Sequence, residues 1–327
     1  MSVYLEGVLA LMGINILMAL SVYAILTTDQ LSLGNAGFMA IGAYTSAYLT
    51  VKAGVPIFPA IIIGAVAAGI FGLIIGVPAL RLKGMYLVMA TLGFAEVVRT
   101  FFLNFEPTGG AYGFRGPSGT TLTMIYSWVF GFMVFFWLLG RSRLGRSLDA
   151  VQDDEEVART VGLNVTLLKV GVFCLGAFIA GVAGALYAHY MFYIESNNFN
   201  FLISAMAVLF VILGGKNTFW GAVVGAIIFS VLPETLRFMK DWRLSLYGVL
   251  LVSMMIFRPS GIITRQMVRA FGERSEKIFG KNNSYPGQAG TNQEFARNPP
   301  NPPFLKGGKG GFLKFVIILG TNSFVRA

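Results

Sequence analysis

The sequence is a succession of long apolar runs separated by short polar connections. A helix that crosses the hydrocarbon core of a bilayer needs about 20 predominantly apolar residues. Runs near that length are Val3–Leu26, Phe38–Val51, Pro59–Leu80, Gly84–Leu103, Thr121–Leu139, Val170–Tyr190, Phe201–Leu213, Trp220–Leu236 and Leu244–Phe257. We therefore predict an all-α, polytopic membrane helix bundle of about eight or nine spans.

The composition agrees with a membrane protein. Only 12% of the 327 residues are charged and 55% are hydrophobic, whereas soluble domains carry about a quarter charged residues. The net charge of +10 arises mainly in residues 258–327, which contain 11 basic and three acidic residues. This distribution suggests a cytoplasmic tail that follows the positive-inside tendency. It argues against a surface that binds nucleic acid.

Two of the runs are too short for an untilted span. Phe38–Val51 follows the glycine-rich segment 31–37, and Phe201–Leu213 precedes the glycine-rich segment 214–221. We expect broken or re-entrant helices at both places, because non-helical backbone at membrane depth is tolerated only inside protein or beside a cavity.

The charged connections predict the orientation. Segments 81–83, 141–169 and the chain from Arg258 onward are the most basic or the longest polar connections, so we place them in the cytoplasm. With nine spans, the N-terminus and the glycine-rich connection 104–120 then lie outside. The basic connection 237–243 also falls outside, which conflicts with the positive-inside tendency.

An acidic island, residues 153–156, interrupts the apolar sequence. Acidic residues favour a helix N-terminus, and Gly162 suits a helix C-cap. Segment 144–169 therefore predicts a short helix, parallel to the membrane, with Leu148, Val151, Val157 and Val161 as its apolar positions. A partner that moved this helix would move both flanking spans. The alternative is a solvated loop with one helical turn.

The island resembles the EAA-type coupling loop of ABC importer permeases. Glu156, Ala158 and Gly162 correspond to the Glu, the second Ala and the Gly of that motif, although Val157 replaces its first Ala and no Leu-Pro follows. The resemblance implies that an ATPase docks here. It makes Asp154, Glu155, Glu156, Ala158 and Gly162 the candidate coupling residues.

Further segments, in the same order along residues 5–265, resemble LivM-type permease subunits of branched-chain amino-acid ABC importers. They are 31–44, 78–99, 108–110, 145–151, 162–165, 180–187, 214–215, 220–222 and 233–234. The resemblance implies two ATP-binding subunits, a homologous second permease subunit and a periplasmic substrate-binding protein. It also implies a multi-pass protein of the bacterial inner membrane.

The expected organisation is a permease domain at 1–265, with the coupling loop 144–169 inside it, and a tail at 281–327. The tail is low-complexity Pro and Gly sequence that cannot form a packed core. We expect it to be disordered and functionally idle.

Two groups of polar residues are candidates for the lining of a transport pathway. Ser32, Asn35, Tyr44 and Thr45 offer neutral hydrogen-bonding groups beside a broken helix; the alternative is small-residue helix packing. Glu96 and Arg99 are three residues apart and share a helix face. Charges at membrane depth often mark a pathway, and the alternative is a structural ion pair.

The sequence lacks a phosphate-binding loop of the form G-x-x-x-x-G-K-[ST], a nucleophile motif and a metal-binding motif. Lone His189 follows a span and is expected at the membrane interface. We therefore predict a transporter without catalytic residues or cofactors of its own. Two alternatives stay open: a permease for urea or amides, and a self-sufficient secondary transporter or channel that uses Glu96 or another buried acid for ion coupling.

Overall fold

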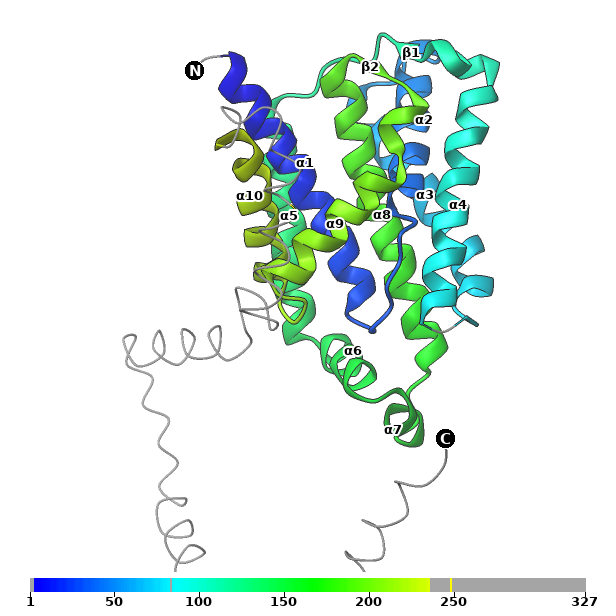
Figure 1. Ribbon diagram of the computed structural model, residues 1–327, viewed down its shortest axis with the longest axis vertical. Coiled ribbons are helices and arrows are strands. Elements are labelled where there is room, and N and C mark those ends of the chain that lie inside the picture. Colours follow the sequence, from blue (N-terminus) through cyan, green and yellow to red (C-terminus); the bar gives the residue numbers. More distant parts are fainter. Residues whose placement is uncertain (1–2, 83, 236–247, 249–327) are drawn as a thin grey trace, which may run out of the picture. The chain divides into compact units, whose positions relative to one another are not determined.

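The structure is a computed structural model that describes residues 3–82, 84–235 and 248, all within one compact unit (Figure 1). Its elements are α1 (Val3–Leu26), α2 (Asn35–Lys52), α3 (Ile57–Ala79), α4 (Met85–Asn104), η1 (Glu106–Thr108), η2 (Gly110–Tyr112), β1 (Phe114–Arg115), α5 (Leu122–Arg141), α6 (Arg143–Asp153), α7 (Glu155–Thr160), α8 (Val165–Met191), β2 (Tyr193–Ile194), η3 (Ser196–Phe199), α9 (Phe201–Gly214) and α10 (Phe219–Thr235).

The predicted all-α membrane fold is confirmed. Six segments of the described chain are long and apolar enough to cross a membrane: α1, α3, α4, α5, α8, and η3 with α9. Helices α2 and α10 cover two more of the predicted runs. The last run, 244–257, lies outside the described residues apart from residue 248, so the total of eight or nine spans stays a prediction.

Helix α8 forms the centre of the bundle and packs against α1, α2 and α3. Small residues make this possible, because they let helix backbones approach closely. A Cβ on Gly184 would collide with the backbone of Met39 in α2, and one on Gly176 would lie 2.6 Å from Ile25 in α1. A Cβ on Gly181 would lie 2.9 Å from the Cα of Ala65 in α3.

The chain between α1 and α2 is non-helical and largely buried, as expected for a broken helix. Side chains from distant elements accept hydrogen bonds from its backbone and from the first turn of α2. The Leu33 N–H donates to Thr91 Oγ1 of α4 at 3.1 Å, and the Ala36 N–H donates to Ser204 Oγ of α9 at 2.8 Å. Non-helical backbone is therefore stable here because protein, and not lipid, surrounds it.

Polar connections gather at two opposite ends of the bundle (Figure 1). Helices α6 and α7, the α1–α2 connection and the α3–α4 connection lie together at one end and line a common cavity. The N-terminal end of α1 lies at the other end, where β1 pairs with β2. This arrangement agrees with the sidedness predicted from charge, in which α6 and α7 face the cytoplasm. The basic connection 237–243 lies outside the described residues.

His189 does not follow the span, as expected, but lies within α8, two residues before its end; its interfacial position stays a prediction. Its side chain is fully buried within α8, where Nε2 lies 3.0 Å from Thr50 Oγ1 of α2 and Nδ1 lies 2.8 Å from the Ala185 carbonyl oxygen. The helix continues two residues beyond His189, so the ring packs between spans.

Candidate functional site

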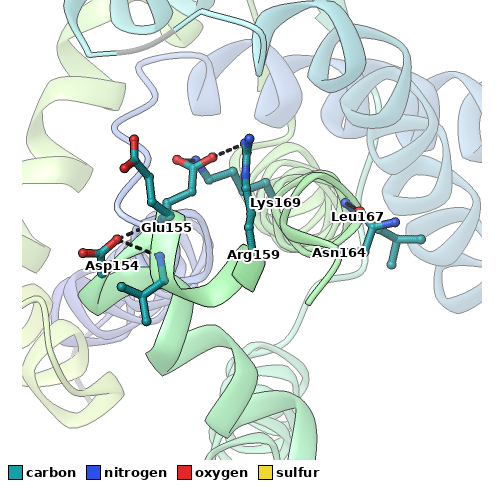
Figure 2. Close-up of polar contacts among 8 residues, drawn as sticks. Asp154, Glu155, Arg159, Asn164, Leu167 and Lys169 are labelled. Carbon is teal, nitrogen blue, oxygen red and sulfur yellow. Dashed lines mark hydrogen bonds and ion pairs between the residues drawn. The ribbon is translucent and has the colours of Figure 1, made fainter. Parts of the chain in front are cut away.

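The predicted single helix in segment 144–169 is wrong in one respect: the structure has two helices, α6 and α7. Asp154 separates them because its backbone is extended and its carboxylate caps α7. Asp154 Oδ1 accepts hydrogen bonds from the backbone N–H groups of Glu156, at 2.8 Å, and Val157, at 3.1 Å (Figure 2). An aspartate in this position satisfies helix donors that otherwise lack partners. The acidic island therefore starts a helix, as predicted from its charge.

Gly162 ends α7 in the predicted capping role. It has φ +86°, a conformation that glycine adopts without strain. The Gly162 N–H donates to the Arg159 carbonyl at 3.0 Å, and the Leu163 N–H donates to the Ala158 carbonyl at 3.2 Å. These two bonds form a Schellman motif. The chain then turns directly into α8, whose first turn Asn164 caps through the N–H of Leu167.

A small core and an ion-pair network fasten α7 to the flanking helices. Ala158 packs in a buried cluster with Val151 of α6 and Val165 of α8. Glu155 bridges two cations, Lys169 Nζ at 2.7 Å and Arg159 Nη2 at 2.6 Å (Figure 2). The hydrogen bond from Lys169 is the largest cause that lowers the pKa of the Glu155 carboxyl, and Arg159 adds to it.

We expect the Glu155→Gln variant to be less stable than the native chain at pH 7, by about 1 kcal/mol for a partly buried ion pair. A lowered folded-state pKa means that the carboxylate stabilises the protein above its unfolded pKa. This contribution is lost as the pH falls through the lower, folded-state pKa. Thermal unfolding of the two purified proteins between pH 7 and pH 3 should therefore converge at acid pH. A constant difference across this range would contradict the assignment.

The apolar positions predicted for this segment face two ways. Leu148 and Val151 are buried against the bundle, whereas Val157 of α7 and Val161, the residue directly after α7, are 57% and 76% exposed. The side chain of Glu156 is exposed beside them. The uneven spacing of these residues in the sequence was the only signal for this division. An acidic and apolar surface at the tip of a protruding helix is a suitable contact for a protein partner.

Helices α6 and α7, the predicted coupling helices, also reach the end of α1. The Gln152 side-chain nitrogen lies 3.4 Å from the Leu26 carbonyl oxygen, where α1 passes into the non-helical segment. At the other end of α6, the Ser142 hydroxyl caps the helix by accepting a hydrogen bond from the Gly145 N–H. The N–H and the hydroxyl of Ser142 both donate to the Leu139 carbonyl of α5, which holds the turn between α5 and α6. Hydrogen bonds therefore connect the two ends of α6 to α1 and α5.

The four neutral pathway candidates do not share one face. Asn35 Nδ2 donates to Ser21 Oγ at 2.6 Å, which in turn donates to the Gly176 carbonyl at 2.8 Å. Tyr44 lies nine residues further along α2, on its opposite side, and stacks on Phe102 with the ring centroids 4.2 Å apart. Ser32 is buried in the non-helical segment and Thr45 is partly exposed.

Two of these candidates nevertheless keep unused hydrogen-bonding groups. The Asn35 side-chain oxygen and the Tyr44 hydroxyl are buried and have no partner among the described residues. A buried polar group without a partner is unfavourable, and such a group in a native structure needs an explanation. The pathway role predicted for Asn35 and Tyr44 would supply these atoms with a partner.

Glu96 and Arg99 form an ion pair of 2.7 Å on α4. Arg99 also donates to the Asn197 side chain of η3 at 3.1 Å, so the pair ties α4 to the α8–α9 connection. The side chains are 37% and 29% exposed, respectively. This geometry favours the structural alternative over a free acid for ion coupling. No group of three or more His, Cys, Asp or Glu residues in the described part of the chain could hold a metal ion.

The sequence of this chain matches one known protein family over most of its length. The family model described as "Branched-chain amino acid transport system / permease component" matches residues 4–258. The chain belongs to this family. Among its relatives, this permease component is 32% identical to the high-affinity branched-chain amino acid transport system permease protein LivM of Escherichia coli K12. That match covers 77% of this chain and 66% of the relative, so it spans just under two thirds of the relative's length.

Two other relatives show the breadth of the family. A probable branched-chain amino acid transport permease protein LivM of Methanocaldococcus jannaschii is 27% identical, over 64% of this permease component and 69% of the relative. The autoinducer 2 import system permease protein LsrC of Yersinia pestis (strain Pestoides F) is 26% identical, over 59% and 62%. No solved structure matches the permease component.

The family match and the six span-length apolar helices confirm the predicted location, a multi-pass protein of the inner membrane. They also confirm the resemblance to LivM-type permeases. The coupling and pathway roles of individual residues stay predictions.

Proposed function

We propose that this permease component translocates branched-chain or related amino acids across the bacterial inner membrane as part of an ABC importer. ATP is bound and hydrolysed on two partner subunits. A homologous second permease subunit completes the membrane domain, and a periplasmic binding protein delivers the cargo. The names of the LivM relatives, which refer to branched-chain amino acid transport, support the cargo class.

The observation that carries the proposal is the construction of the coupling helices. They protrude from the bundle, expose Val157 and Val161 at the tip, and are fastened to α5, α1 and α8 by caps, a small core and an ion-pair network. A rigid attachment of this kind transmits displacement into the spans. A carrier that needed no second protein would gain nothing from exposed apolar residues at this position.

Reconstitution tests the proposal. The chain should be purified with the products of its neighbouring genes, inserted into vesicles that contain ATP, and supplied with labelled leucine and the binding protein outside. We expect uptake that requires ATP, the ATPase and the binding protein together. Uptake by this chain alone, driven by an ion gradient, would establish the secondary-transporter alternative and would refute the importer.

The same assay identifies the cargo, which needs a test because a relative of this chain is named for autoinducer 2 import. Urea and short amides should be offered beside leucine, isoleucine and valine. We expect the aliphatic amino acids to be taken up and the amides to be excluded. Uptake of urea alone would replace the proposed cargo and leave the ABC mechanism intact.

The C-terminal tail, 281–327, lies outside the described residues and beyond the family match. We expect its deletion to leave ATP-driven uptake within about twofold of the native rate, because a low-complexity Pro and Gly segment does not form a packed core. Insertion should be measured in parallel by membrane fractionation. Loss of assembly on deletion would show that the tail has a structural function.

A further inference from the structure

The end of the bundle that carries the coupling helices contains a cavity of about 680 Å³. Its walls come from the α1–α2 connection, the α3–α4 connection, helices α6 and α7, and the first turns of α8. Pockets that bind small molecules have volumes of about 300–1,000 Å³ and combine apolar walls with a few polar groups. The cavity therefore has the dimensions of a ligand site.

Its lining has two chemically distinct parts. Leu31, Leu80, Met85 and Val88 provide apolar surface from the two connections and α4. The coupling helices contribute carboxylates, of which Asp153 and Glu156 form no ion pair within the described chain. A molecule that fits both parts has an aliphatic body and a positively charged group.

Lys169 and Gln30 add the remaining recognition groups. Lys169 lines the cavity and bonds Glu155, but an ammonium group has three donors, so donors remain for a ligand carboxylate. Gln30 also lines the cavity and is only 5% exposed, yet its side-chain oxygen has no hydrogen-bond partner among the described residues. A buried acceptor without a donor is unfavourable, and a ligand ammonium group would satisfy it once this oxygen turned into the cavity.

We propose that this cavity binds an aliphatic amino acid from the cytoplasmic side and that its occupancy inhibits transport. The zwitterion supplies the ammonium group for the carboxylates and Gln30, the carboxylate for Lys169, and the aliphatic side chain for the apolar wall. This inference rests on the proposed function, because it makes the imported cargo the inhibitor. It assigns the same cargo a second site at the release side.

The position of the cavity gives the physical reason for inhibition. Its walls include the elements that an ATPase would displace and the connections against which they would move. Displacement of α6 and α7 relative to the α3–α4 connection changes the shape of the cavity. A ligand that fits one shape better stabilises that state, and its differential affinity shifts the equilibrium. High product concentration thus slows further import.

The test uses the complete transporter in vesicles that contain ATP together with zero to millimolar unlabelled leucine. The initial rate of labelled leucine uptake and the rate of ATP hydrolysis are measured together, so isotope exchange is separated from inhibition. We expect both rates to fall by about fivefold or more, the lower range of typical coupling between sites. Internal 4-methylpentanoate, which lacks the ammonium group, should not inhibit.

Two variants link the effect to the cavity. Met85→Trp fills the space from a residue that is 67% exposed, and Gln30→Leu removes the unused acceptor. Both should transport at zero internal leucine and lose the inhibition. Met89→Trp is the matched control: Met89 lies one turn further along α4, is 64% exposed and does not line the cavity. It should keep the native inhibition.

The outcomes distinguish a failure of the inferred inhibition from a failure of the proposed import function. Uptake at zero internal leucine establishes the importer whatever follows, and its absence refutes the importer. Native rates that do not change with internal leucine overturn the inference alone. Loss of ATPase binding in Met85→Trp, with no response of the native complex to leucine, would also overturn it, because the cavity would then receive the ATPase.

Discussion

Replacing Gly184 by valine is expected to prevent the chain from folding into a stable bundle. Gly184 lies where α8 crosses α2, and a Cβ at this position would meet the backbone of Met39, with the carbonyl carbon 2.7 Å away. Backbone atoms cannot move aside as the end of a flexible side chain can. The cost should exceed the ~1–3 kcal/mol that is usual for overpacked sites, because the two helices have to separate.

The Gly171→Val variant is the matched control for this prediction. Gly171 belongs to the same helix, and a Cβ there would have no neighbour within 4 Å. We expect the control to give a monodisperse protein in detergent with a native melting temperature, whereas Gly184→Val should aggregate or be degraded in the membrane. A normal melting curve for Gly184→Val would show that α2 and α8 are not in contact at this point.

The second large effect is expected at the coupling helices. The double variant Glu156→Ala, Gly162→Val should abolish ATP-driven uptake while membrane insertion stays intact. Removal of Glu156 deletes an exposed carboxylate of α7. Valine at φ +86° is strained by about 1–3 kcal/mol, so the Schellman turn that aims α7 at α8 is lost. The measurements are vesicle uptake and co-purification of the ATPase.

A companion variant separates docking from folding. Val161→Asp changes a side chain that is 76% exposed and leaves the backbone of α7 unaltered, so only the contact with the partner is affected. It should also lose the ATPase on purification. The matched control for the Glu156→Ala, Gly162→Val variant is the double variant Glu106→Ala, Gly54→Val at the opposite end of the bundle. It likewise changes an exposed glutamate and a positive-φ glycine in open space, and it should keep the ATPase. Retention of the ATPase by Val161→Asp would remove the docking assignment.

Local features of the fold follow from the sequence. The first apolar run predicts α1 with the observed bounds, Val3–Leu26. The acidic island and Gly162 predict the start and the end of α7, because capping depends on the side chains and backbone of adjacent residues. The division of segment 144–169 into two helices does not follow from the sequence pattern, because four consecutive acidic residues do not show that Asp154 is the one that caps α7.

The candidate site was predicted in part. The sequence correctly directed attention to Asp154 and Gly162, whose geometry is local. It did not indicate that Val157 and Val161 are exposed, that Gln152 reaches the end of α1, or that Gln30 and Lys169 line one cavity. These relations join residues that are far apart in the chain, and only the packed bundle brings them together.

Sequence alone determined that this chain is a helical membrane protein, where most of its helices begin and end, and which segment leaves the membrane. Which face of each span is buried depends on the packing of the folded bundle. In α3, the apolar Ile62 and Ile63 are exposed while Ala65 and Ala68 are fully buried. A span that is apolar all round shows no amphipathic pattern, because lipid is as apolar as the interior. Its orientation is fixed by close packing of small residues and by buried hydrogen bonds, both of which depend on helices distant in sequence.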